Sequence, residues 1–444
     1  MRGICSQLVC GIIVILMSGA CFGQAPGEGR GDADRNLLDD LRRQGYEAMY
    51  NLDYDGARRR FTEMVRRFPE HPAGPLCLAA CLWLEEMNRS RQLRASLFSG
   101  ESSSARSEQP APRTVEHFRQ LTRTAQSLAE ARLRRDPRDV EGLYFLGAAE
   151  GLKAVFAAGV ERRFLASVSD GAQSAAHHRQ LLKLDPHRHD AELTIGVYDY
   201  VAASLPLHIK LLASVAGVRG SKKRGLETLQ RVVREGHWAS DTARVLLVDL
   251  YNREKRWPEA IAMSRELSAR YPRNYLFQLQ TADALVAQAA SVRQTASASP
   301  ATTSPSTGYA SEAFSIFESL LDKQSTREAA TVNAPPDIIH FRYGEALLMA
   351  EEPERAAREF QAAALVAGTK EGLACIARLR AAQSMDIAGK RADAIAEYRA
   401  VLRYSDAYQA HEQARRGLAR PYRSESGVGS DRTERGTAPK AGRD

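Results

Sequence analysis

The sequence predicts an all-α protein built from antiparallel helix pairs, and three observations support this prediction. Ala, Leu, Arg and Glu dominate, and these residues are good helix formers. Aromatic residues make up only 7% of the 444 residues, and alternating Val/Ile runs are rare, which argues against a large sheet. A fixed spacing of small and aromatic residues also recurs along the chain. This length exceeds one compact core, so we expect several domains or one elongated array.

Residues 1–23 have the pattern of an export signal. Arg2 supplies a positive charge, the run Leu8–Met17 is apolar apart from one glycine, and small residues follow. Cleavage after Gly23 would release the chain, whereas Cys21, after Ser-Gly-Ala, would permit lipidation as a bacterial lipoprotein. An uncleaved anchor or a misassigned start is the third alternative. The chain is therefore expected in the periplasm or cell envelope.

Beyond this signal, we find no run of about 18 apolar residues that would span a bilayer. The longest candidate, Leu205–Val218, is interrupted by Pro206, His208 and Lys210. A buried helix is the favoured interpretation of this segment, and contact with a membrane surface is the alternative.

The cysteines argue against a disulfide-stabilised or metal-binding protein, and the charge argues against a nucleic-acid-binding one. Cys77, Cys81 and Cys375 follow the signal region, and their number and spacing suit neither a disulfide framework nor a metal site. We interpret them as packing residues. The net charge of +8 is mild, and basic clusters such as Arg58–Arg60 have no stacking aromatics between them, so no nucleic-acid partner is expected.

The repeated spacing is clearest between residues 41 and 72. Gly45 and Ala57 are small enough to let two helices approach closely, and Phe61 fills the space between them. Pro69 ends the second helix, because it has no N–H and disfavours helix in the residue before it. The spacing recurs at Ala260 and Pro272, at Ala313 and Phe317, at Ala356 and Phe360, and at Ala394 and Tyr398.

This pattern resembles the tetratricopeptide-repeat (TPR) family over most of residues 36–420. The resemblance implies a right-handed superhelical solenoid with inserted loops. It is poor between residues 150 and 240, and the early Trp of the family pattern is missing from most units. The block Ile195–Leu276 is similar to one in bacterial TPR proteins of unassigned role and, more distantly, to the eukaryotic tetratricopeptide repeat protein 39 group.

Composition sets the expected domain boundaries. Segments 24–34 and 421–444 have few apolar side chains, so we predict disorder in both. A first array is expected over 35–290 with a loop at 94–113, and a second over 309–420. The Ser/Thr/Ala/Pro-rich segment 291–308 is predicted to be a flexible linker between them.

A search for chemistry yields no catalytic, cofactor or metal assignment. The densest group of potential ligands is His177, His178, His187, His189 and Asp190, but its spacing matches no zinc pattern. We interpret it as a polar helix end followed by a loop.

Two other segments have a structural and a functional interpretation. Tyr198-Asp199-Tyr200 suits packing with a surface carboxylate better than an active-site acid. Gly217–Gly225 has the wrong residue order for a phosphate-binding loop and suits a turn between helices.

The resemblance implies that the first helix of each pair lines a concave surface that grips a protein partner. The side chains expected there are Gln44, Glu47, Tyr50, Asp249, Asn252 and Glu345. The leading hypothesis is therefore an exported scaffold or adaptor whose partner is a protein of the envelope. The alternatives are an envelope enzyme with a catalytic carboxylate in 150–240, and a lipid-binding protein that uses residues 205–218.

Overall fold

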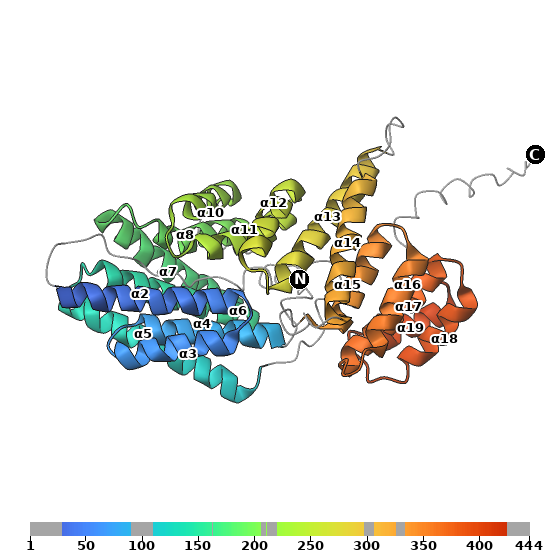
Figure 1. The fold of residues 1–444 in the computed structure, drawn as a ribbon, viewed down its shortest axis with the longest axis horizontal. Helices are drawn as coiled ribbons and strands as arrows, with labels where there is room; N and C mark the ends of the chain where they lie inside the picture. Colours follow the sequence, from blue (N-terminus) through green and yellow to red (C-terminus); the bar gives the residue numbers. More distant parts are fainter. Residues whose placement is uncertain are drawn as a thin grey trace, which may run out of the picture. The chain divides into compact units, whose positions relative to one another are not determined.

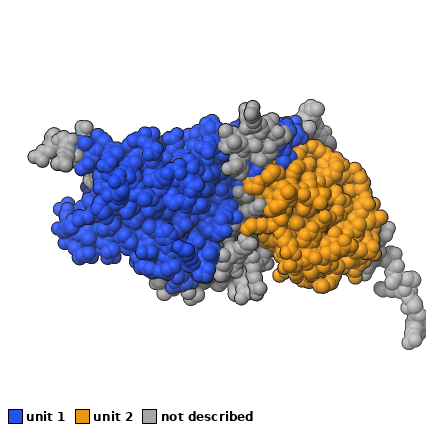
Figure 2. Space-filling model, turned by 60° about the horizontal axis from the view of Figure 1, so that its bottom comes forward, with its two compact units in different colours: residues 1–334 blue, residues 335–444 orange. Residues whose placement is uncertain are grey.

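The computed structural model describes residues 29–89, 110–161, 163–205, 210, 220–296, 306–325 and 334–423. All regular secondary structure in these residues is helical, which confirms the all-α prediction. The chain forms two compact units, residues 1–334 and residues 335–444, which Figure 2 distinguishes by colour.

Within each unit, every described helix packs against the next described one along the chain (Figure 1). Unit 1 contains α2 (Gly29–Tyr50), α3 (Tyr54–Arg67), α4 (Ala73–Arg89), α5 (Pro112–Arg135), α6 (Val140–Gly159), α7 (Phe164–Leu184), the 3-10 turn η3 (His189–Ala191), α8 (Glu192–Ala203), α10 (Lys222–Glu235), α11 (Ser240–Arg253), α12 (Trp257–Arg270), α13 (Tyr275–Ala296) and α14 (Ser306–Ser325). Unit 2 contains α15 (Pro336–Met349), α16 (Pro353–Leu365), α17 (Glu371–Ile387), α18 (Arg391–Val401) and α19 (Ala410–Ala419).

A glycine facing an aromatic ring sets the spacing within the repeated pairs. A Cβ added to Gly45 of α2 would lie 2.2 Å from Cε1 of Phe61 in α3, so only glycine allows the ring to fill this space. Phe61 and Ala57 are completely buried, as the repeated spacing predicts. The same contact recurs at Gly344 of α15 on Phe360 of α16, and Gly417 of α19 makes a related contact with Tyr398 of α18, the helix before it.

The turn that joins the two helices of a pair is also repeated. One residue in each turn has a positive φ, and these residues are Leu52, Lys255, Glu351 and Gly389. The N–H of the residue that follows each of them donates to the carbonyl five residues earlier, for example from Arg256 to Tyr251 and from Glu352 to Leu347. Such left-handed residues satisfy the last carbonyls of a helix. Four turns with one geometry show that these pairs are copies of one structural repeat.

The start of unit 1 also contacts its later part. The hydroxyl of Tyr50, the last residue of α2, lies 2.6 Å from the Thr242 hydroxyl of α11. The side chain of Asn274, just before α13, donates to the Tyr50 carbonyl at 2.7 Å, and Asn51 Oδ1 accepts from the N–H of Arg273 at 3.3 Å. We call these contacts the α2 clasp. They tie the first helix of the array to the start of α11 and of α13.

The structure changes two of the expected boundaries. Helix α2 begins at Gly29, so the prediction of disorder for 24–34 is wrong for residues 29–34; Arg35 pairs there with Asp32 one turn earlier. Helix α13 continues to Ala296, inside the predicted linker, and the two units divide after Ala334 instead. Helical propensity explains the first part of the linker, because Ser291–Ala296 continue the Ala-rich sequence of α13.

Several expectations fall outside the described residues. They are the export signal at 1–23 with Cys21, most of the loop 94–113, most of the segment 205–218, and the tail beyond residue 423. Among the helices that the structure describes, none is both long and apolar enough to cross a membrane.

The repeated turn predicts an unusual stabilising substitution. Lys255 is exposed and has φ of 57°, a conformation that costs an L-residue about 1–2 kcal/mol. Lys255→Gly should therefore stabilise unit 1 by about 0.5–1 kcal/mol after the added entropy of the unfolded glycine is subtracted. Urea unfolding followed by circular dichroism measures this, with Lys255→Ala as the matched control. A Gly variant no more stable than the Ala variant would contradict the assigned turn.

Candidate functional site

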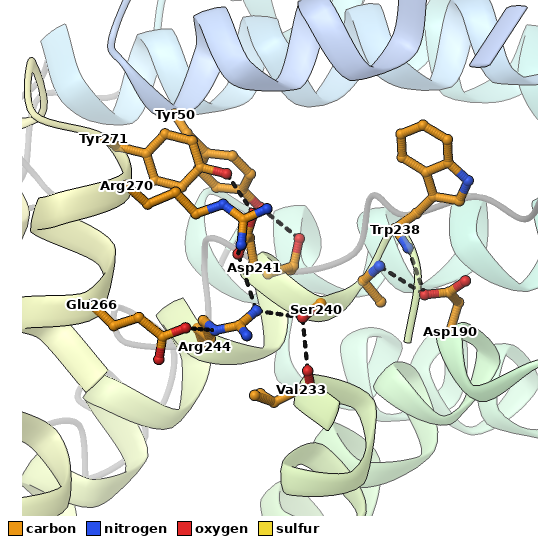
Figure 3. Close-up of polar contacts among 12 residues, drawn as sticks. Tyr50, Asp190, Val233, Trp238, Ser240, Asp241, Arg244, Glu266, Arg270 and Tyr271 are labelled. Atoms are coloured by element: carbon orange, nitrogen blue, oxygen red, sulfur yellow. Dashed lines mark hydrogen bonds and ion pairs between the residues drawn. The ribbon is translucent and has the colours of Figure 1, made fainter. Parts of the chain in front are cut away.

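The α2 clasp is held in place by a network of charges around Asp241 in the first turn of α11 (Figure 3). The Tyr271 hydroxyl donates to Asp241 Oδ2, and Arg270 and Arg244 lie 3.2 Å and 3.1 Å from Oδ1. Burial, together with the neighbouring Asp241 carboxylate, raises the pKa of Tyr271, so this hydroxyl remains a donor. The start of α11 is thus joined to the end of α12 and to Tyr271, which follows it, where α2 meets them.

Two turns beyond the clasp, α11 and α13 carry a group of hydrogen-bond acceptors. Gln280 Nε2 of α13 donates to Asp249 Oδ1 of α11 at 3.2 Å, which joins the two helices. Asn252 and Asp283 each lie three residues further along their helices, on neighbouring positions of the same side. We call Asp249, Asn252, Gln280 and Asp283 the acceptor cluster.

The acceptor cluster contains more acceptors than donors. The side chains of Asp249 and Asp283 are buried, with exposures of 8% and 3%, while Asn252 and Gln280 are half-buried. Asn252 Oδ1 and Gln280 Oε1 are buried atoms with no hydrogen-bond partner among the described residues. A buried acceptor without a donor costs about 1–3 kcal/mol.

Burial dominates the electrostatics of this cluster. It raises the pKa of Asp249 from 3.8 to about 7, although Arg253 one turn further and the Gln280 side chain both favour the charged form. The carboxyl therefore sits near half-ionisation at neutral pH. A donor or cation that reached it would stabilise the carboxylate.

The structure brings three of the six predicted partner-binding residues into this region. Tyr50 is buried in the α2 clasp, and Asp249 and Asn252 belong to the acceptor cluster. Gln44 donates to Asp40 at 2.6 Å, and the largely exposed Glu47 lies 3.9 Å from Arg43, so both contact their own helix α2. A partner-binding role for these residues remains a prediction.

Glu345, the sixth predicted residue, lies in unit 2 and forms a two-pronged ion pair. Arg380 of α17 donates from Nε and Nη2 to the two carboxylate oxygens, at 2.6 Å and 3.0 Å. Arg380 also donates to Gln383 at 3.0 Å. These contacts join α15 to α17, and any partner that used Glu345 would have to compete with Arg380.

The histidine group of the sequence is divided among separate structural roles. His177 pairs with the buried Glu150 at 2.8 Å, while His178 contacts Thr194 and the Tyr144 carbonyl. Burial lowers the pKa of His178 to about 4, so it is neutral at neutral pH. Asp190 accepts from the N–H groups of Trp238 and Ala239 (Figure 3). Within the described part of the chain, no group of three His, Cys, Asp or Glu could hold a metal ion.

The other two candidate segments also have structural roles. The interpretation of Asp199 as a surface carboxylate is wrong, because its side chain is buried and accepts from Arg224 Nε at the start of α10. The Tyr200 hydroxyl donates to Glu254 at 2.7 Å. A Cβ on Gly220 would lie 2.3 Å from the Asp199 carbonyl, and one on Gly225 would lie 2.7 Å from the carbonyl of Gly196 in α8. These glycines permit α8 and α10 to approach closely, which accounts for them without a phosphate ligand.

Sequence reasoning missed Gln280 and Asp283, because polar residues in α13 carry no motif. The available signal was indirect. Both lie within about three turns after Asn274, which ends a Tyr-Pro-Arg-Asn segment in the sequence. The hydrogen bond between Gln280 and Asp249 became visible only once the fold placed α13 against α11.

The paired helices, repeated turns and glycine–aromatic contacts define a TPR-like all-α repeat protein. Among solved structures, the chain is similar to human IFIT1, solved as a dimer with m7Gppp-AAAA, at 13% identity over 94% of this chain and 84% of that one, with a TM-score of 0.42. It is also similar to a tetratricopeptide repeat protein from Parabacteroides merdae (13% identity, 78% and 99% covered, TM-score 0.29) and to yeast Tom70 (9%, 88% and 92%, 0.34).

At these values the likeness assigns neither a function nor a ligand to this chain. No family model matches it, and no curated protein does.

The raised pKa of Asp249 predicts how stability depends on pH. Burial makes the folded state bind the proton of Asp249 more tightly than the unfolded state does. The free energy of unfolding therefore decreases as the pH rises from the unfolded pKa of this carboxyl, near 4, to its folded pKa, near 7. Asp249→Asn keeps an acceptor for Gln280 and cannot ionise. Its stability relative to the natural chain should therefore rise by about 1.4 kcal/mol per pH unit between about pH 5 and 7.

Urea unfolding at pH 5, 6, 7 and 8 measures this difference, with the exposed-carboxyl variant Glu227→Gln as control. If the two variants showed the same pH profile, Asp249 would not be the buried acid that the structure describes.

Proposed function

We propose that this protein is an exported, non-catalytic TPR-like scaffold that binds a protein partner of the cell envelope through the α11–α13 acceptor cluster. The observation that carries the proposal is the pair of buried amide oxygens, Asn252 Oδ1 and Gln280 Oε1, left without donors beside a buried carboxyl. Stacked helix pairs present the side chains of their first helices along an extended surface, which suits a peptide or helix of another protein.

Export rests on the sequence of residues 1–23, with its charged start, apolar run and small residues before Gln24. Release after Gly23 and lipidation of Cys21 make different mature chains. The mass of the N-terminal peptide, isolated from soluble and membrane fractions, distinguishes Gln24 as the first residue from a diacylated Cys21.

The enzyme alternative receives no support from the buried carboxylates of block 150–240. Glu150 pairs with His177, Asp190 holds two backbone N–H groups, and Asp199 binds Arg224. Each of them therefore has a partner within the chain that explains its position. A catalytic acid would instead be expected to face a reacting group.

Site-specific cross-linking in cells tests the proposed scaffold function. A photoreactive amino acid at position 252 should yield a discrete adduct with one envelope protein, identified by mass spectrometry. The same amino acid at Arg59, which is exposed on the second helix of the first pair, should yield none. Adding Asp249→Ala should reduce the adduct at position 252 at least fivefold. Equal adducts from both positions, or none from 252, would refute a docking site on this cluster.

A further inference from the structure

One histidine occupies the place that a phenylalanine ring takes in other helix pairs. A Cβ added to Gly147 of α6 would lie 2.6 Å from Nε2 of His178 in α7. Phe61 and Phe360 have the same relation to glycines of α2 and α15. His178 is only 1% exposed, so its ring is enclosed where α6 and α7 approach most closely. The pair α6–α7 is therefore closed by a titratable side chain.

The hydrogen bonds of His178 fix one neutral form of its ring. Nε2 lies 3.0 Å from the backbone carbonyl of Tyr144 in α6, and a carbonyl only accepts, so Nε2 carries the proton. Nδ1 is then the acceptor, and the Thr194 hydroxyl of α8 donates to it. The neutral ring thus joins α7 to both α6 and α8, and both of its nitrogens are in use.

The groups around His178 offer no counter-charge to a second proton on its ring. On α7 the neighbouring His177 is bound to Glu150 of α6 at 2.8 Å, and this hydrogen bond raises the pKa of His177. On α6 the Tyr144 ring stacks 5.3 Å from the His178 ring, and on α8 the partner Thr194 is uncharged. Burial, assisted by the charge of His177, lowers the pKa of His178 to about 4.

We propose that His178 is an acid-sensitive latch: when its ring takes a second proton, α7 is released from α6 and α8 while unit 2 stays folded. A charged ring that is enclosed between helices, with no carboxylate on either nitrogen, is strongly disfavoured, and opening the contact lets water solvate it. Because the same ring holds both neighbouring helices, its release loosens the junction between α6–α7 and the helices that follow. The latch belongs to the fold of unit 1 and requires no partner.

The sign of the pH dependence follows from the two states of the ring. In the opened chain the pKa of His178 returns to its ordinary value of 6.5, whereas in the closed chain it is about 4. The stabilising effect of the neutral ring is therefore fully present above about pH 6.5 and is lost as the pH falls towards 4. Between pH 7 and pH 5 the equilibrium constant for opening should rise about twentyfold, since one unit of pKa difference is a factor of ten.

Hydrogen exchange of the full chain at pH 7 and pH 5 tests the latch, because slow amide exchange measures local opening. His178→Gln keeps one donor and one acceptor but cannot take the proton. The exchange rate of the natural chain divided by that of this variant should rise at least tenfold from pH 7 to pH 5 in α6, α7 and α8. The ratio should stay constant in α11–α13 and in α15–α19. His117→Gln, on the exposed face of α5, is the matched control and should behave as the natural chain does.

Two exchange results would overturn the inference. They are an equal ratio at both pH values and a rise of the same size in α11–α13, because opening would then not be local. His178→Phe, which has the residue type of other pairs, replaces the Gln variant if that one does not fold.

A measurement on the natural chain keeps the test independent of the variants. NMR titration of its ten histidine rings should show one ring that stays neutral at pH 5 with its proton on Nε2. If every histidine ring is protonated at pH 5, the latch does not exist.

Discussion

The contact between Tyr50 and Thr242 joins residues 192 positions apart, and the arrangement of unit 1 depends on it. Neighbouring helix pairs in a repeat array contact only each other, so their stacking alone does not bring the first helix to a later pair. The α2 clasp supplies that contact through a hydroxyl, a backbone carbonyl and the Asn274 amide. It therefore fixes which parts of α11 and α13 are covered and which are left for other molecules.

Aromatic packing supports the same contact from about two turns earlier in α2. Arg42 is 3% exposed, and its guanidinium carbon lies 5.1 Å from the Trp238 ring centroid, 5.8 Å from that of Phe145 and 6.0 Å from that of Tyr46. A buried cation among rings is favoured by their quadrupoles, and it brings α2, α6 and the loop before α11 together. Trp238 is in turn positioned by Asp190, which accepts its backbone N–H.

The sequence predicted the local features of this fold and missed its long-range ones. A helix pair could be predicted from Gly45, Ala57 and Phe61, because these residues pack within one pair and helical periodicity fixes their spacing. The repeated turns were harder to predict. Only Gly389 is a glycine, whereas Leu52, Lys255 and Glu351 adopt the same positive φ and give no sign of it in sequence.

The candidate site shows the same division. Asp249 and Asn252 could be predicted as first-helix polar residues, since one helix is enough to place them. Gln280 and Asp283 could not, because their importance depends on how α13 packs beside α11. Tyr50 was expected to contact a partner, which stays a prediction, and its place in the clasp could not be foreseen from the sequence. Long-range pairing between helices is the information that local periodicity lacks.

A double-mutant cycle between Tyr50 and Thr242 tests this account most directly. Tyr50→Phe and Thr242→Val each remove one hydroxyl of the 2.6 Å contact while preserving side-chain volume. If α2 closes onto α11, the free energies of unfolding of the two single variants and the double variant should show a coupling of about 1 kcal/mol. Strict additivity, with no measurable coupling, would mean that the clasp does not form and would contradict the account.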